Sequence, residues 1–341
     1  MPPRIANQTQ PRPNDLPDRK SLDARATHVT ISSSILGIEK SFYVALPADY
    51  DEPQNALVRY PAIYLFRGHE HEWIHKWQDK SRRGRTVIDV YNALLEEGKV
   101  GPMILVFPGI SSDTNRVPGF LIDFKSPDLV KEEPGIGTGC FESYFLKELI
   151  PEVDRRYRTL AERAGRAVDG FSLGGFQSIK IAAQRPDLFC SAGAFDGTFL
   201  YALDRGKSIR RTDKVLSNPI FAPAFGVPRD YEYAAANSPA NLLWRADKAA
   251  ISQVQWLIRS GPEAAEPWHS NYFRAQHVAG ILKQRGIDNG IDPVLTGATH
   301  SWHWADKHME GTLPLHWKAI VATASRSWGI EPGREPSDSA E

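Results

Sequence analysis

The chain has 341 residues, and its formal net charge is zero because 41 Lys and Arg residues balance 41 Asp and Glu residues. Hydrophobic residues make up 41% of the chain and charged residues 24%, which is typical of a globular protein that buries a large core. The balanced charge does not favour a nucleic-acid partner, and no stretch approaches the roughly 18 apolar residues of a membrane-spanning helix. We therefore expect neither a nucleic-acid nor a membrane partner, while the sequence does not indicate an oligomeric state.

The two ends of the chain differ in composition from its middle. Residues 1–25 and 331–341 are polar and rich in proline, and both segments are predicted to be disordered. Residues 26–330 contain no repeat and no low-complexity linker, which favours one domain. The first 20 residues lack the apolar run of a secretory signal, so a cytoplasmic location is expected.

The chain contains two cysteines, Cys140 and Cys190. Two are too few for a disulfide framework, and each lies beside apolar residues. We expect two buried free thiols, with a bridge between them as the alternative.

Strands and helices are predicted to alternate from residue 29 onwards. A leading hairpin is expected over 29–33 and 41–46. The further strands are expected at 62–66, 103–107, 166–170, 192–195, 254–259 and 293–295, and the helices at 87–97, 140–157, 174–184, 271–285 and 315–325. Apolar strands separated by helices predict a mostly parallel sheet that is covered on both faces.

Residues 199–248 interrupt this rhythm with four X-Pro pairs and several aromatic residues. One interpretation is an irregular or helical excursion over one edge of the sheet that lines the substrate cleft. The other is a long surface loop packed by its own aromatic side chains.

A candidate nucleophile lies in Gly170-Phe171-Ser172-Leu173-Gly174, which matches G-x-S-x-G. An apolar strand precedes the motif and an amphipathic helix follows it, which is the setting of a nucleophile elbow. The two glycines keep Cβ atoms out of a sharp, strained turn, and the N–H of Leu173 is expected to face a developing oxyanion.

The stretch around the elbow, from Ala167 to Phe189, resembles the esterase D, enterochelin esterase and mycolyltransferase-antigen group of α/β-hydrolases. The segments 149–158 and 299–302 resemble two further motifs of this group, so the resemblance runs from about residue 30 to 325. It implies the α/β-hydrolase fold and a serine hydrolase that needs no cofactor.

The candidate base is His300, in Thr299-His300-Ser301-Trp302 after the last predicted strand. A histidine can take the serine proton and return it to the leaving group because its pKa lies near neutrality. His303 and His308 are competing candidates that we interpret as structural.

The orienting acid is harder to assign. It is expected after the strand at 254–259, where the resemblance places an acid about three residues after the glycine, but Ala264 occupies that position. Glu266 is preferred slightly over Glu263, and both are retained. Asp196, which follows an earlier strand, is a distant third candidate.

The loop after the strand at 62–66 contains Gly68, which allows the backbone to turn the N–H of His69 inward as the second oxyanion donor. Gly68 and Trp302 are predicted to contribute to substrate binding. The loop also holds a cluster of His and Glu between His69 and His75, in which His71 and His75 are four residues apart, but the loop already has a role in the serine mechanism, so no metal is predicted.

The sequence therefore predicts a serine esterase that acts on a small-molecule ester through an acyl-enzyme on Ser172. Three alternatives remain open at this point: acyl transfer to a sugar or other alcohol, a non-catalytic binding protein of the same fold, and a metal-dependent hydrolase.

Overall fold

The computed structural model describes residues 19–267 and 269–328. The segment 331–341 and most of 1–25, both predicted to be disordered, lie outside this range. Residues 19–25 are described, and they are ordered against the domain. The Asp23 N–H donates to the carbonyl of Ile74 at 2.8 Å, and the buried Asp23 carboxylate accepts from the Thr86 hydroxyl at 2.6 Å. The domain therefore begins earlier than residue 26.

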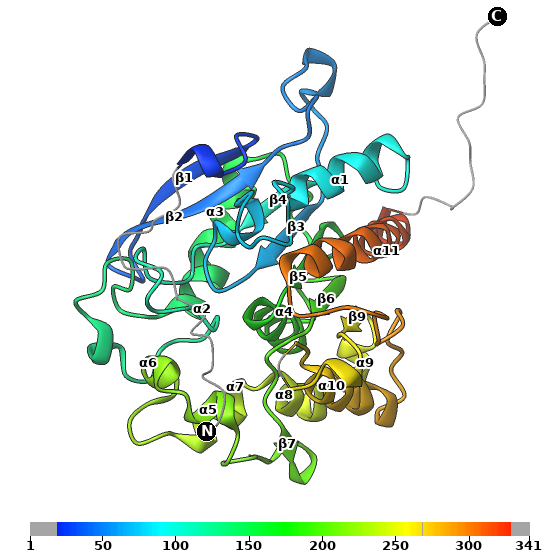
Figure 1. Cartoon of the computed structure of the whole chain (residues 1–341). Helices are drawn as coiled ribbons and strands as arrows, with labels where there is room; N and C mark the ends of the chain where they lie inside the picture. The colour runs from blue at the N-terminus through cyan, green and yellow to red at the C-terminus, as the bar shows by residue number, and fades with distance from the viewer. Residues whose placement is uncertain (1–18, 268, 329–341) are drawn as a thin grey trace, which may run out of the picture.

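A seven-stranded sheet with the order β1-β2-β4-β3-β5-β6-β9 forms the centre of the molecule (Figure 1). Its strands are β1 (Ala26–Ser33), β2 (Ile38–Ala45), β3 (Ala62–Phe66), β4 (Ile104–Phe107), β5 (Arg166–Gly170), β6 (Ser191–Phe195) and β9 (Gln255–Arg259). Strands β1 and β2 form the predicted antiparallel hairpin, and β2 pairs antiparallel with β4. The pairs from β4 to β9 are parallel. This topology confirms the predicted α/β-hydrolase fold.

Helices cover both faces of the sheet. They include α1 (Val87–Glu96), α3 (Ile150–Arg156), α4 (Leu173–Gln184), α10 (Tyr272–Gln284) and α11 (Trp302–Trp328). Side chains of β3 alternate between two cores: Tyr64 and Phe66 pack with α3 and α4, whereas Ile63 and Leu65 pack with α1 and α11. This alternation follows from the two-residue period of a strand, and both faces must be apolar because both are covered.

Three predicted elements differ in the structure. Residues 293–295 form only an isolated bridge between Ser260 and Val294 instead of a strand. The helix expected at 140–157 consists of α2 (Phe141–Tyr144), a π-helical turn, η5 (Phe145–Leu149), and α3. The helix expected at 315–325 is the C-terminal part of the much longer α11.

The excursion at 199–248 is helical rather than irregular. It comprises β7 (Ala202–Leu203), β8 (Ser208–Ile209), α5 (Lys214–Ser217), η8 (Pro219–Phe221), α6 (Ala222–Phe225), α7 (Tyr231–Asn237) and α8 (Pro239–Arg245), and α9 (Lys248–Ile251) follows. The side chains of Asp213, Asn218 and Asp230 cap short helices in it by accepting backbone N–H groups. Polar side chains thus stabilise several short helices within a proline-rich segment.

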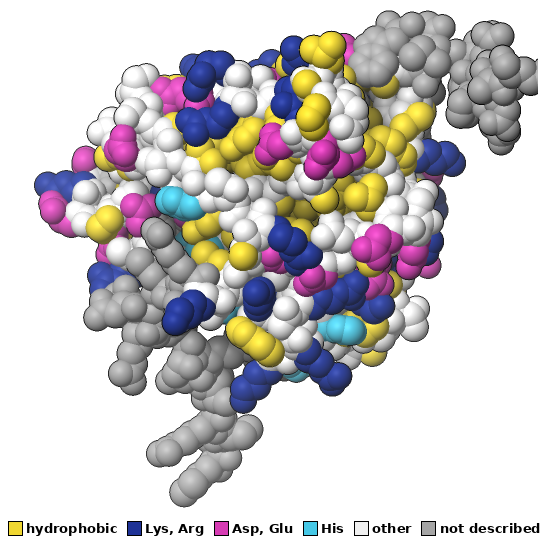
Figure 2. Space-filling view, turned by 90° about the horizontal axis from the view of Figure 1, so that it is seen from above, with side chains coloured by type: hydrophobic (Ala, Val, Ile, Leu, Met, Phe, Trp, Pro, Cys, Tyr) yellow, Lys and Arg dark blue, Asp and Glu magenta, His cyan; other side chains and the backbone are white. Residues whose placement is uncertain are grey.

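The face seen from above carries Lys and Arg side chains interspersed with Asp and Glu, with apolar side chains between them (Figure 2). Mixed signs on one face agree with the balanced composition. Among the helices of the described part of the chain, none combines the length and the apolar character needed to cross a bilayer.

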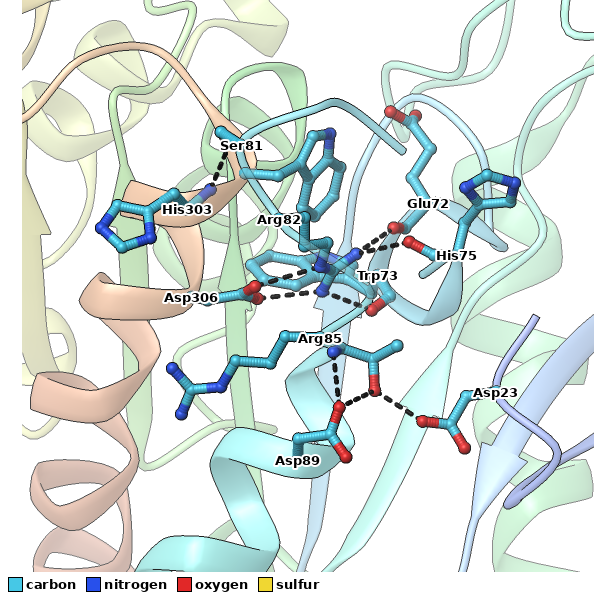
Figure 3. Close-up of polar contacts among 12 residues, drawn as sticks. Asp23, Glu72, Trp73, His75, Ser81, Arg82, Arg85, Asp89, His303 and Asp306 are labelled. Carbon is cyan, nitrogen blue, oxygen red and sulfur yellow. Dashed lines mark hydrogen bonds and ion pairs between the residues drawn. The ribbon is translucent and has the colours of Figure 1, made fainter. Parts of the chain in front are cut away.

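The buried side chain of Arg82 joins the loop after β3 to α11 (Figure 3). Its guanidinium donates to both carboxylate oxygens of Asp306 at 3.0 and 2.9 Å, and to the carbonyls of Glu72, Trp73 and His75 at 2.7, 2.7 and 3.2 Å. The loop and the start of α11 are therefore held in one fixed arrangement.

Both cysteines are free. Cys190 is buried, as expected, and burial raises the pKa of its thiol to about 12. Cys140 is only half-buried, which differs from the expectation.

Replacing Asp306 by alanine is expected to lower the free energy of unfolding by about 3–5 kcal/mol, because it leaves the Arg82 charge buried without its partner. Denaturant unfolding followed by circular dichroism measures the change. As a matched control, Asp187→Ala removes a carboxylate from the exposed pair Arg185–Asp187 and should cost no more than about 1 kcal/mol. Equal losses in the two variants would contradict the role of Arg82.

In the native protein at pH 8, only Cys140 is expected to react with Ellman's reagent, because the Cys190 thiol stays protonated and inaccessible. Both thiols should react in guanidinium chloride, and Cys140→Ser should leave the native protein unreactive. Absence of any reactive thiol in denaturant without reductant would instead indicate a disulfide.

Candidate active site

The candidate residues gather where parallel strands β3, β5 and β6 end. Ser172 follows β5, His69 follows β3, and Asp196 follows β6 directly. The carboxyl ends of neighbouring parallel strands meet at one edge of the sheet, which is the usual position of a site in an α/β fold.

Ser172 has the backbone conformation expected of a nucleophile elbow. Its φ is 58° and its ψ is −114°, a combination that L-residues rarely adopt. A Cβ at Gly170 would lie 2.2 Å from the carbonyl carbon of Gly174, and a Cβ at Gly174 would lie 1.9 Å from the carbonyl oxygen of Phe66. The turn therefore requires glycine on both sides of the serine.

Ser172 lies at the start of α4, and the residue is 8% exposed. Its oxygen is 3.4 Å from the hydroxyl oxygen of Thr198. Among the described residues it forms no hydrogen bond with His300. Hydrogen bonds between a catalytic serine and its histidine are often long before substrate binds. The lack of this bond therefore does not argue against the pairing of Ser172 with His300.

His300 contacts Asp196. Its Nδ1 lies 2.5 Å from Oδ2 of Asp196, whose side chain is fully buried. The other carboxylate oxygen accepts from the N–H of Asn271 at 2.7 Å and from the hydroxyl of Ser270 at 3.3 Å. Because Asn271 precedes the first turn of α10, the positive end of that helix stabilises the carboxylate.

The structure contradicts the expectation that Glu266 or Glu263 would contact the imidazole. Oε1 of Glu266 accepts from the N–H of Phe273 at 3.1 Å and so caps the first turn of α10. Glu263 is exposed in the 3₁₀ turn η9 (Glu263–Ala265). Because α10 starts late, the loop after β9 brings Ser270 and Asn271 to Asp196 at the end of β6. The loop does not supply the acid itself.

The two predicted oxyanion donors differ in their surroundings. Leu173 is the first residue of α4, so its N–H has no carbonyl partner within the helix. The N–H of His69 donates to Oε1 of Glu72 at 2.8 Å. In this structure the predicted second donor is therefore already bonded to a carboxylate, which the sequence did not suggest.

Three histidines of the loop after β3 are neutral at pH 7. Burial lowers the pKa of His69 well below its ordinary value, lowers that of His71, and brings that of His75 to about 4. Nδ1 of His69 lies 2.9 Å from the hydroxyl oxygen of Ser111. Within the described ranges, no three His, Cys, Asp or Glu side chains are placed to hold a metal ion.

A pocket of about 580 Å³ opens in front of Ser172. Its lining residues come from the loop after β3, from the elbow and from the excursion: Arg67, Gly68, His69, His71, Glu72, Gln78, Asn115, Pro118, Ser172, Leu173, Thr198, Asn218, Ile220 and Phe221. Gly68 lines this pocket. The excursion lines the cleft, which favours the first of its two interpretations.

Trp302 does not line this pocket. It is 4% exposed and packs edge-on against Trp73, with a ring separation of 5.0 Å, and against Phe171 at 5.3 Å. The guanidinium of Arg82 lies 4.6 Å from its ring. The prediction that Trp302 contacts substrate is therefore wrong, because the side chain fills the core beneath the site.

Sequence reasoning did not identify Thr198 or the hydrogen bond from the His69 N–H to Glu72. It also ranked Asp196 too low among the candidate acids. A signal for Asp196 was present, since Asp-Gly follows a buried strand that neighbours the nucleophile strand. Thr198 and Glu72 carry no sequence pattern that would single them out.

Residues 33–278 match the family model described as "Putative esterase". This range contains Ser172 and Asp196 and ends before His300. The chain is 26% identical over 271 residues to Esterase Rv1288 of Mycobacterium tuberculosis (strain ATCC 25618 / H37Rv), covering 77% of this chain and 52% of that protein. It is 30% identical over 170 residues to an endo-1,4-beta-xylanase/feruloyl esterase of Xylanibacter ruminicola, covering 50% and 21%.

Solved structures share the fold. A ferulic acid esterase superposes with a TM-score of 0.62 at 20% identity, covering 86% of this chain and 98% of that one. An S-formylglutathione hydrolase from Agrobacterium tumefaciens superposes with a TM-score of 0.60 at 18% identity, covering 86% and 95%. The chain spans about half the length of the mycobacterial relative. Since the family match extends over more than half of its residues, the chain belongs to this esterase family.

Proposed function

We propose that the protein hydrolyses carboxylic esters through an acyl-enzyme on Ser172. One observation carries this proposal: a serine in a strained elbow opens onto a pocket, while a histidine held by a buried carboxylate comes from the neighbouring loop. Family membership supports the same reaction class.

The proposed mechanism assigns one role to each group. The Nδ1–H of His300 donates to Asp196, so Nε2 is left to accept the proton of the Ser172 hydroxyl as the oxygen attacks the ester carbonyl. The imidazolium that forms is stabilised by Asp196, and its proton passes to the departing alcohol. Water then repeats these steps on the acyl-enzyme and releases the acid.

The oxyanion is proposed to bind to the N–H of Leu173 and to that of His69. The second donor becomes available only when the Glu72 carboxylate moves away from it. Arg67, whose Nε lies 3.4 Å from Oε2 of Glu72, is placed to hold the displaced carboxylate. Without this movement a carboxylate beside the oxyanion would oppose the reaction, because like charges would meet in a partly dehydrated pocket.

The substrate is proposed to be a small-molecule ester. The pocket combines apolar side chains such as Ile220 and Phe221 with polar ones such as Gln78 and Asn115. Such a lining suits an acyl group that carries both apolar and hydrogen-bonding atoms.

The wild type is expected to hydrolyse p-nitrophenyl acetate and butyrate and to be labelled by a fluorophosphonate probe. Ser172→Ala should lose labelling and lose turnover by on the order of 10⁵-fold, because the nucleophile is absent. Circular dichroism of both proteins checks that the variant folds. A folded wild type that the probe does not label would overturn the proposal.

Asp196→Asn is expected to lower kcat by roughly 10³–10⁴-fold, because an amide favours the wrong imidazole tautomer. Glu266→Gln and Glu263→Gln should stay within about twofold of wild type, since neither side chain reaches His300. The three variants are compared by steady-state hydrolysis of p-nitrophenyl acetate. A large loss in a glutamate variant together with an active Asp196→Asn would reverse the assignment.

A further inference from the structure

A second pocket adjoins the candidate active site on the side of His300. Its volume is about 570 Å³, and residues from two segments line it: Lys80, Ser81, Arg82, Arg83, Arg85, Thr299, Ser301, His303 and Trp304. The proposed mechanism does not use this pocket.

Cationic side chains dominate one wall of the pocket. Lys80 and Arg83 are exposed, and among the described residues no carboxylate lies within ion-pair distance of either. The charge of Arg85 is shared with Glu310 at 2.7 Å, and that of Arg82 is buried against Asp306. The pocket therefore presents two cations without counter-charges, which favours an anionic ligand.

The neighbouring carboxylate of Asp79 does not cancel this charge by an ion pair. One of its oxygens accepts from the N–H and the hydroxyl of Ser81 at 2.9 and 2.5 Å, and the other accepts from the N–H of Trp302 at 3.0 Å. The Ser81 oxygen in turn accepts from the N–H of His303 at 3.0 Å (Figure 3). These bonds fix the segment that carries Lys80 and Arg83 to the start of α11.

The pocket lies next to the position of the leaving alcohol. Thr299 and Ser301, the two neighbours of His300 in the chain, both line it. Gln78 lines the pocket of Ser172 and Lys80 lines the second pocket, so roughly 7 Å of extended chain at most separates the two walls. Because His300 must give its proton to the departing oxygen, the alcohol portion leaves on the side of His300.

We propose that this pocket binds an anionic group, a carboxylate or a sulfonate-like group, on the alcohol portion of the ester. The inference rests on the proposed esterase function and adds a substrate class to it. Lys80 and Arg83 supply the charge, and the Trp304 indole supplies an apolar wall for the part of the alcohol that joins the anion to the ester oxygen.

The test compares esters with the same acetyl group and different leaving groups. The anionic esters are 4-acetoxybenzoate and 4-acetoxybenzenesulfonate, and the neutral ester is 4-acetoxybenzamide. The double variant K80Q/R83Q removes both unpaired charges, and K207Q/K283Q removes two charges from exposed lysines outside either pocket.

K80Q/R83Q is expected to lower kcat/KM for the anionic esters by on the order of fivefold, with the neutral ester within about twofold. K207Q/K283Q should match wild type on all three esters. Raising the salt concentration from about 0.05 to 0.5 M should reduce the effect, because both cations are exposed. A loss confined to one anionic ester distinguishes a carboxylate site from a sulfonate site.

If K80Q/R83Q hydrolyses all three esters like the wild type, or loses activity equally on all of them, the anion site is wrong and the esterase function stands. If the wild type hydrolyses none of the esters, the esterase function is in question. Equilibrium dialysis of 4-hydroxybenzoate then decides the anion site separately. Weaker binding by K80Q/R83Q than by wild type supports the site, and equal binding overturns it.

Discussion

The position of the Ser172 turn relative to the His300 loop depends on one buried carboxylate, that of Asp169. It lies at the end of β5, three residues before Ser172, and accepts from the N–H of Gly170. His308 and His316 of α11 bind it at 3.1 and 3.0 Å, and the Thr312 hydroxyl donates to it at 3.0 Å. Although burial alone would raise it, the two histidines hold the pKa of Asp169 well below its usual range. Because α11 begins two residues after His300, this cluster sets how far His300, the proposed base, lies from Ser172, the proposed nucleophile. A Cβ at position 193 would lie 2.2 Å from the carboxylate, so the neighbouring strand must carry glycine there.

The elbow and the base could be predicted because both depend on short stretches of sequence. A strained serine needs Gly170 and Gly174 beside it, and these positions can be read directly from the chain. The acid could not be placed in this way, since the distance between His300 and each candidate depends on where a loop folds back. Two glutamates stood in the expected loop, but neither contacts His300, whereas Ser270 and Asn271 of the same segment bind Asp196. Because β6 lies between β5 and β9 in the sheet, the strand order favours the acid after β6 as the partner of His300.

Contacts between distant segments explain the other differences between the sequence predictions and the structure. Sequence indicates that the amide of His69 should turn inward, but not that a carboxylate three residues later would accept from it. Trp302 beside His300 suggested a substrate contact, yet its neighbours Trp73 and Arg82 lie more than 200 residues away in the chain. Those partners make it a core residue. Side-chain packing of this kind depends on the assembled sheet, and no local pattern predicts it.

The residues that hold the site in place and the residues that form the pocket walls differ in their tolerance to substitution. The proposed catalytic groups are fixed by two buried contacts: Asp169 of β5 with His308 and His316 of α11, and Arg82 with Asp306. Loss of either partner leaves a charge buried without solvent. The pocket walls, in contrast, are made by the segment 218–221 and by the loop after β3, where several side chains are partly exposed. Substitutions in the segment 218–221 are expected to cost little stability, because its side chains are exposed or half-buried and hold no buried charge, whereas His71 and Glu72 in the loop after β3 are buried. A protein of this fold can therefore keep its frame while the pocket walls change. For this reason the motif predicts the reaction class, while the proposed substrate preference depends on the two pockets near His300.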